Sequence, residues 1–228
     1  MKFDDISTEI TQLSHYRINL CHPRGICLLI NNVPMARAVK VLEKQLKALF
    51  KSLFFDVQVR RRLRTLQLYK VAQEFAKKDH SDFDSFVFII MSLGQDNDIS
   101  DVDGRKASLE HVMTEYTSTS CPTLQGKPKL FFVQRFTVLK PSEVRDCSTK
   151  AQCFTDEGID RQPVYPSANI GGNNCPEEAD FLLTCVTSAI NKAKPIQEAA
   201  ALWFIQVRFL VNTLFASNDH IAQHAEWL

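Results

Sequence analysis

Short, unbroken apolar runs recur along this chain, and they constrain its fold more than any other feature. They occupy residues 26–30, 86–91, 130–133 and 181–186. Runs of this length without alternating polar residues are typical of strands that are buried on both faces of a sheet. Helical segments separate the runs. This alternation predicts an α/β fold with a central, mostly parallel sheet between two layers of helices.

Further elements are expected from local patterns. Residues 54–59 favour an additional strand, and the polar segment 95–109 contains Asp103-Gly104, a dipeptide that favours a two-residue hairpin turn. Helices are expected where apolar residues repeat every three or four positions. That repeat covers residues 42–53, 68–75, 109–116 and 200–215.

The segment at residues 137–178 has no periodic pattern. Pro, Gly, Ser, Thr, Asn and Asp dominate it. Connections without secondary structure that are longer than about 12 to 15 residues are uncommon inside compact domains, and they are usually functional or disordered. We therefore expect a long loop that separates two regions of one domain.

Composition argues against several classes of function. The 27 Lys and Arg residues balance 26 Asp and Glu residues, so no strong net field favours nucleic acid or anionic lipid. No apolar run approaches the roughly 20 residues that span a membrane, and residues 1–14 lack the features of a secretory signal. The seven cysteines form no CxxC pair, which favours reduced thiols. We expect a cytoplasmic protein that binds no membrane, nucleic acid, metal or cofactor.

Five stretches of sequence resemble the caspase family in their order and spacing. Residues 24–32 read RGICLLINN, like the first strand of the family, and residues 84–87 read DSFV, like the start of the strand that normally ends in Ser-His-Gly. Residues 126–134 read GKPKLFFVQ, like the strand that runs into Gln-Ala-Cys-Arg-Gly. Residues 179–182 and 203–206 resemble the strand and helix that open the small subunit. The resemblance implies a caspase-like three-layer α/β/α sandwich.

The resemblance also implies how the chain is divided. Family members continue with another helix and a final strand, whereas here 22 residues follow Gln206. We expect that C-terminal strand to be missing and its neighbour to have an unpaired edge. No recruiting domain is expected before the first strand. The expected regions are a short N-terminal peptide at residues 1–21, a large-subunit-like region at 22–136, an inter-subunit loop at 137–178 and a truncated small-subunit-like region at 179–228.

Hydrocarbon side chains occupy the two catalytic positions that the resemblance implies. A cysteine protease needs a thiolate nucleophile and an imidazole that accepts its proton. Leu93 stands where the family has histidine, and Phe136 stands where it has cysteine. Neither side chain can attack a carbonyl or move a proton, and loss of a nucleophile costs on the order of a million-fold in rate. We predict no enzyme activity. Filling of the vacant cleft and exclusion of substrate are both open as roles for the two residues.

The pocket that holds the substrate aspartate in the family is expected to be vestigial. Family members use two arginines and a glutamine; Gln134 matches the glutamine, and Arg37 lies within one position of the first arginine. The family motif that contains the second arginine is replaced by Ala-Lys-Pro at residues 193–195. Lysine and proline cannot build a bidentate carboxylate clamp, so tight binding of aspartyl peptides is not expected.

Three aspartates in the long loop are candidate cleavage sites. In the family, the loop between the subunits is cut after aspartate, and the corresponding segment here contains Asp146, Asp156 and Asp160. Residues 157–160 read EGID, which resembles a caspase recognition tetrapeptide. We therefore expect a partner caspase to be able to cut the chain there.

These features are similar in kind to the FLIP class of decoy caspases. The expected function is that of a non-proteolytic pseudo-subunit, which binds an active caspase paralogue in a heterodimer or transient complex and activates or inhibits it. The alternative is a scaffold or decoy substrate that caspases cleave in the loop. A residual cysteine protease is a third interpretation, and it would need Cys121 or Cys185 to face His80 or His111.

Overall fold

A five-stranded parallel sheet forms the centre of the molecule, which we describe from a computed structural model over residues 21–33, 37–94, 98–138, 180–190 and 196–215. The strand order is β2-β1-β3-β6-β7, and every neighbouring pair is parallel. The predicted apolar runs lie within β1, β3, β6 and β7, which confirms the sheet, but the predicted burial of residues 181–186 on both faces is wrong, because Leu183 and Cys185 are exposed. The strands are β1 (Gly25–Asn31), β2 (Phe55–Arg61), β3 (Ser85–Leu93), β6 (Lys129–Val138) and β7 (Phe181–Ile190).

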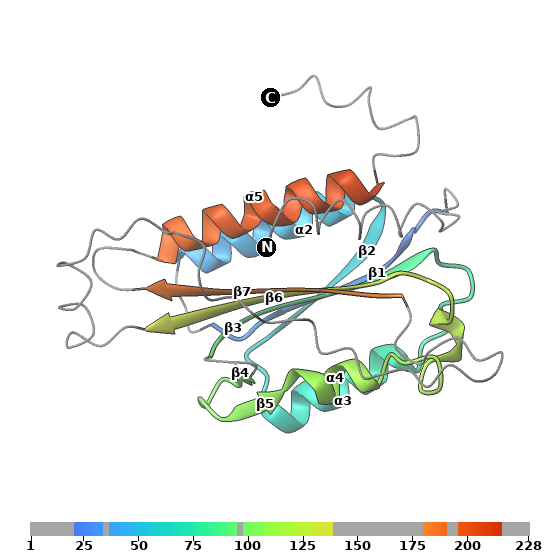
Figure 1. Cartoon of the computed structure of the whole chain (residues 1–228), viewed down its shortest axis with the longest axis horizontal. Helices are drawn as coiled ribbons and strands as arrows, with labels where there is room; N and C mark the ends of the chain where they lie inside the picture. The colour runs from blue at the N-terminus through green and yellow to red at the C-terminus, as the bar shows by residue number, and fades with distance from the viewer. Residues whose placement is uncertain (1–20, 34–36, 95–97, 139–179, 191–195, 216–228) are drawn as a thin grey trace, which may run out of the picture.

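Two layers of helices enclose the sheet (Figure 1). Helices α2 (Arg37–Ser52) and α5 (Ile196–Phe215) cover one face, whereas α3 (Thr65–Ala76) and α4 (Leu109–Thr114) cover the other. A short 3-10 turn, η1 (Pro122–Leu124), precedes β6. The predicted three-layer α/β/α sandwich is therefore confirmed. Among the residues described, none of the helices has the length and apolar character that a membrane crossing requires.

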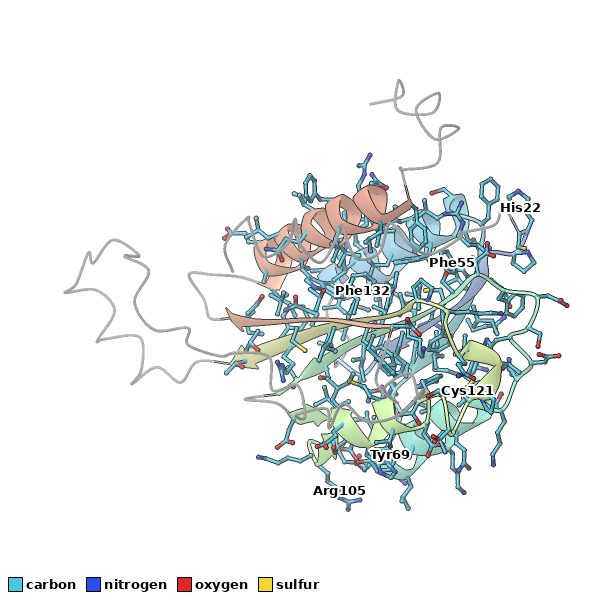
Figure 2. The ribbon with its side chains drawn as sticks, turned by 45° about the vertical axis from the view of Figure 1, so that its right-hand side comes forward. His22, Phe55, Tyr69, Arg105, Cys121 and Phe132 are labelled. Atoms are coloured by element: carbon cyan, nitrogen blue, oxygen red, sulfur yellow. The ribbon has the colours of Figure 1, made fainter. Side chains whose placement is uncertain are left out.

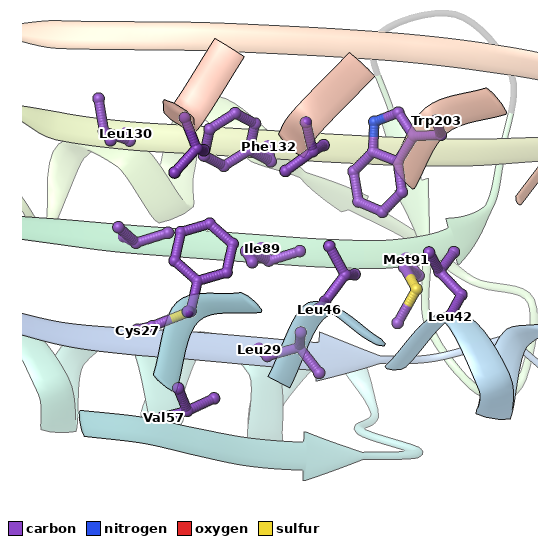
Figure 3. Close-up of a cluster of buried hydrophobic side chains, with 14 of the residues drawn as sticks. Cys27, Leu29, Leu42, Leu46, Val57, Ile89, Met91, Leu130, Phe132 and Trp203 are labelled. Carbon is purple, nitrogen blue, oxygen red and sulfur yellow. The ribbon is translucent and has the colours of Figure 1, made fainter. Parts of the chain in front are cut away.

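Each face of the sheet has its own hydrophobic core, because successive side chains of a strand point to opposite faces. In β1, Cys27 contributes to the core beneath α2 and α5, and Leu28 contributes to the core beneath α3 and α4. Figure 3 shows Phe132 and Trp203 in the first core, and Figure 2 shows Cys121 on the other side of the sheet. All seven residues of β1 are buried, which explains why its sequence lacks polar alternation.

The predicted hairpin is present, but its turn is wider than two residues. Five residues separate the paired strand ends. The Asp101 carboxylate accepts hydrogen bonds from the backbone N–H groups of Asp103 and Arg105, at 2.8 and 2.9 Å, and Gly104 adopts a left-handed conformation with φ of 79°. An aspartate side chain thus closes a longer loop than the dipeptide signal predicts. The two strands are β4 (Asp98–Ser100) and β5 (Lys106–Ser108).

All five strands of the central sheet end at the same edge because they are parallel. The strand order reverses direction at β1, since β2 lies on one side of it and β3 lies on the other. In open α/β sheets, ligands bind at the carboxyl edge beside such a switch point. β6 extends through Val138, where it pairs with Ile190, so the strand continues into the first two residues of the predicted loop. This edge is where the candidate site residues are to be found.

Candidate functional site

The ends of β3 and β6 bring together the two positions that the family resemblance assigns to histidine and cysteine. Leu93 and Phe136 are directly paired in the register of these strands. Beyond them, the Gly94 N–H donates to the Phe136 carbonyl at 3.3 Å, and the Thr137 hydroxyl donates to the Gly94 carbonyl at 2.7 Å. Hydrogen bonds therefore continue past the paired positions and hold the strand ends side by side.

Phe136 is part of the hydrophobic core. Its side chain is fully buried in the cluster between the sheet and helices α2 and α5, and the half-buried Leu93 packs against that cluster. Met91 and Trp203 belong to the same core, as Figure 3 shows. The paired positions hold two hydrocarbon side chains and no ionisable group, so they supply neither a nucleophile nor a proton acceptor.

Gln134 matches the family glutamine in sequence, but its amide is used within the sheet. The side chain is fully buried, and its Nε2 donates to the Arg135 carbonyl at 2.9 Å and to the Ser188 hydroxyl at 3.0 Å. The Oε1 atom has no hydrogen-bond partner among the described residues. An amide nitrogen has two hydrogens, and both are committed to β6 and β7. Gln134 is therefore not placed to donate to a substrate carboxylate.

Arg37 is the first residue of α2, and it is exposed. Whether Arg37 and Gln134 share a pocket stays a prediction. The segment at residues 193–195 and the three candidate cleavage aspartates lie outside the described residues. Their roles stay predictions. These aspartates are Asp146, Asp156 and Asp160.

Sequence reasoning missed Arg135, which stands where the family word has alanine. The side chain lies on the opposite face of the sheet from Gln134 and is only 5% exposed. Its Nε and Nη1 atoms lack a hydrogen-bond partner in the part of the chain that is described. A Cβ atom on Gly94 would lie 3.6 Å from the Arg135 Cδ and 2.7 Å from the Asp98 carbonyl oxygen, so glycine is needed there. The signal for Arg135 was a charge within an apolar strand.

A buried carboxylate fixes α2 against the ends of β1 and β2. The Asn31 amide donates to Glu43 Oε2 at 2.9 Å, and Arg61 Nε lies 3.0 Å from each oxygen of the same carboxylate. Burial would raise the pKa of Glu43, but hydrogen bonds from Arg61 and Asn31 outweigh burial and hold this pKa below its usual value. Glu43 is therefore charged at neutral pH, and its role is structural.

The cysteines and histidines that a residual cysteine protease would need are not paired with each other. Cys121 is buried, and the His80 Nε2 lies 2.9 Å from the Phe75 carbonyl oxygen. Cys185 is exposed on β7, and His111 is exposed on α4. Within the described ranges, no hydrogen bond joins a thiol to an imidazole ring, and no three His, Cys, Asp or Glu side chains are grouped to hold a metal ion.

The fold and the register of its strand ends define an α/β sandwich of the caspase type. Residues 24–207 match the family model described as Caspase domain. The chain belongs to the caspase family.

Similar proteins include both proteases and a regulator. Caspase-8 of Rattus norvegicus is 29% identical over 203 residues, which cover 81% of this chain and 40% of that protein. The CASP8 and FADD-like apoptosis regulator of Mus musculus is 29% identical over 179 residues, which cover 76% of this chain and 34% of that protein. A solved structure described as "structure of pro-sf-caspase-1" is 28% identical, covers 53% of each chain and has a TM-score of 0.48. This chain thus spans well under half the length of the rat and mouse relatives.

Proposed function

We propose that this chain is a catalytically inactive caspase homologue that binds an active caspase and regulates it as a pseudo-subunit. The observation that carries the proposal is the in-register pair of Leu93 and Phe136 at the ends of β3 and β6. The positions that the family resemblance assigns to base and nucleophile hold side chains that cannot ionise. A caspase scaffold without its chemistry retains binding as a function, and function must be argued from such sites rather than from the fold.

Two further observations support a binding role over peptide hydrolysis. The Gln134 amide donates to Ser188 and to the backbone, so it does not face a substrate. One of the similar proteins, the mouse CASP8 and FADD-like protein, is named an apoptosis regulator. The contacts of Gln134 and this likeness favour the same kind of role.

The physical mechanism we propose is a population shift. A partner that contacts one conformation of an active caspase stabilises that conformation by its differential binding free energy, and the activity follows the population. A difference of about 1.4 kcal/mol changes the ratio of two conformations tenfold. The chain needs no catalytic group for this effect.

A mixing experiment tests the proposal. The purified chain is added to the precursor of a caspase-8-type protease, and cleavage of an aspartyl substrate is measured together with co-purification. We expect binding, a change in the cleavage rate, and no cleavage by the chain alone. An unchanged rate without co-purification would overturn the proposal, and so would thiol-dependent cleavage by the chain alone.

A control variant separates regulation from competition as a decoy substrate. Replacing Asp146, Asp156 and Asp160 with alanine removes the candidate cleavage sites. A pseudo-subunit keeps its effect on the partner in this variant. A decoy substrate loses the effect together with its cleavage.

A further inference from the structure

A buried arginine lies near the carboxyl edge of the sheet, on the face opposite Phe136. Arg135 is only 5% exposed, and its Nε and Nη1 atoms, which carry three of the five guanidinium N–H groups, lack a hydrogen-bond partner within the described ranges. A guanidinium group keeps its proton in proteins, so burial does not make it neutral. Because a buried charge is unfavourable unless it is paired, Arg135 calls for an anion.

A second buried arginine, at the amino edge of the sheet, shows how such a charge is compensated. Arg24 is 2% exposed, and its guanidinium carbon lies 4.9 Å from the centre of the Phe215 ring. Burial lowers the pKa of Arg24, and the negative charge of Asp84 opposes this shift. In the part of the chain that is described, Arg135 has neither an ion pair nor an aromatic ring against its guanidinium group. Its charge is therefore uncompensated by these residues.

Two hydroxyl groups flank Arg135 on the neighbouring strands. Ser92 of β3 and Thr187 of β7 are both paired with Arg135 in the strand register. Side chains at paired positions of neighbouring strands lie on the same face of a sheet, with the strands about 5 Å apart. The Ser92 Oγ is buried and has no hydrogen-bond partner among the described residues, whereas Thr187 is exposed. The row of three side chains thus runs from the interior to the surface.

The surroundings of this row strengthen its attraction for an anion. Val133 lies on the same face of β6 as Arg135, and it is fully buried with Ile99 of the β4–β5 hairpin in the core beneath α3 and α4. Opposite charges attract more strongly in apolar surroundings than in water. The hairpin carboxylate of Asp98 pairs with the Lys106 Nζ at 2.8 Å rather than with Arg135. The positive charge is therefore left for a ligand.

We propose that Arg135, Ser92 and Thr187 bind a phosphate-type oxyanion, either the free ion or the phosphoryl group of a monoester. The planar fork of the guanidinium group matches two oxygens of such an anion, and the hydroxyls on either side can donate to its other oxygens. A carboxylate has only two oxygens, so it uses fewer of these donors. The site goes beyond the proposed regulatory role, and it is separate from the vestigial aspartate pocket, because Gln134 lies on the other face of the sheet.

Calorimetric titration of the full chain with inorganic phosphate tests the proposal. At constant ionic strength in a chloride buffer, we expect one site per chain. Arg135→Lys keeps the charge but loses the fork, so it is expected to weaken binding at least tenfold, and Arg135→Met is expected to abolish it. Ser92→Ala removes one donor and is expected to weaken binding about fivefold. A wild type that binds no phosphate, or an Arg135→Met variant that binds it as tightly as the wild type, would overturn the proposal.

Arg105→Met is the matched control. Arg105 is exposed in the loop of the hairpin, and Figure 2 shows its side chain pointing away from the molecule. This substitution removes the same charge, and we expect the affinity for phosphate to equal that of the wild type. If it falls as far as in Arg135→Met, phosphate responds to net charge and the proposal is wrong. Circular dichroism melts show that each variant is folded, which is expected because an apolar side chain can replace an unpaired buried charge.

Two further titrants distinguish the sources of the anion. O-phosphoserine carries the phosphoryl group of a monoester, and an affinity near that of phosphate assigns the site to such groups, whereas a much lower affinity assigns it to the free ion. Acetate that binds as tightly as phosphate would overturn the assignment to a phosphate-type ligand. In NMR spectra, the Nε–H signal that Arg135→Lys lacks is expected to shift when phosphate is added to the wild type. No caspase is present, so the result is independent of the mixing experiment.

Discussion

The two ends of the β3 and β6 pair differ in their chemistry. At the amino end, the buried Lys129 Nζ donates to the carbonyls of Leu124 at 3.0 Å and Lys127 at 3.1 Å. At the carboxyl end, Leu93 and Phe136 are directly paired, and both have hydrocarbon side chains. One end of the strand pair is thus held by a charged side chain that satisfies backbone carbonyls, whereas two hydrocarbon side chains are paired at the other end.

This difference shows what the family resemblance encodes. The GKPK motif at residues 126–129 is structural, because its two lysines donate hydrogen bonds to backbone carbonyls of the loops that precede β3 and β6. A buried carbonyl without a hydrogen-bond donor costs folding free energy, so a motif that supplies these donors belongs to the scaffold. The positions that the resemblance assigns to chemistry lie at the other end of the same strands. Sequence motifs of the scaffold can therefore persist where the positions that the resemblance assigns to catalysis hold hydrocarbon side chains.

Shortening Phe136 gives the largest effect we predict. Phe136→Ala leaves a cavity in the core beneath α2 and α5, and it is expected to lower the free energy of unfolding by about 3–5 kcal/mol. Urea denaturation measures the loss. Leu202→Ala is the control, since its side chain is 63% exposed and the expected loss is below about 0.5 kcal/mol. Equal losses in the two variants would mean that Phe136 lies in an open cleft.

Removing the ammonium group of Lys129 tests the amino end of the β3 and β6 pair. Lys129→Met keeps most of the stem but leaves the carbonyls of Leu124 and Lys127 without this donor. The expected loss is about 1–3 kcal/mol in the free energy of unfolding, measured by urea denaturation. Lys106→Met is the control, because the Lys106 side chain is 75% exposed and its ion pair with Asp98 is worth at most about 1 kcal/mol. A smaller loss of unfolding free energy in Lys129→Met than in Lys106→Met would contradict a structural role for the GKPK motif.

The central strands could be predicted from sequence because they are buried on both faces. Burial on both sides removes the polar alternation of a strand, and the resulting apolar runs coincide with β1, β3 and β6. β7 also follows an apolar run, although Leu183, Cys185 and Thr187 on one of its faces are exposed. The width of the hairpin turn could not be predicted in the same way. Its loop is closed by the Asp101 carboxylate, which is a side-chain contact that the Asp103-Gly104 pattern does not encode.

The site was easier to predict in position than in its contacts. Sequence words mark Leu93 and Phe136, whose pairing follows from the register of the whole β3 and β6 ladder. The burial of Arg135 was missed because a charged side chain near a strand end usually reaches solvent. The bond between Gln134 and Ser188 joins residues that are 54 positions apart, and contacts over such separations leave no local pattern.

Ser188→Ala tests the contacts of Gln134 at the carboxyl end, and its expected effect on stability is smaller. The substitution removes one acceptor of the Gln134 amide, so we expect a loss of about 1 kcal/mol in the free energy of unfolding. Urea denaturation measures the loss. Thr187→Ala, at an exposed position of the same strand, is the control and is expected to lose less. If Ser188→Ala instead created binding of an aspartyl peptide, the Gln134 amide would be the main obstacle to a working pocket.

The smallest effect is expected at the amino end, from the titration of His80. This side chain is fully buried, and burial outweighs the hydrogen bond to the Phe75 carbonyl, so the imidazole pKa lies below its usual value of 6.5. The unfolded chain then binds more protons than the folded chain as the pH falls below 6.5, and stability is lost in that range. His80→Gln has no such titration, so the difference in unfolding free energy between wild type and variant should move against the wild type as the pH falls. Urea denaturation at several pH values measures this difference. A constant difference would mean that His80 reaches solvent, and the amino end would then be less tightly packed than the hydrocarbon pair at the carboxyl end.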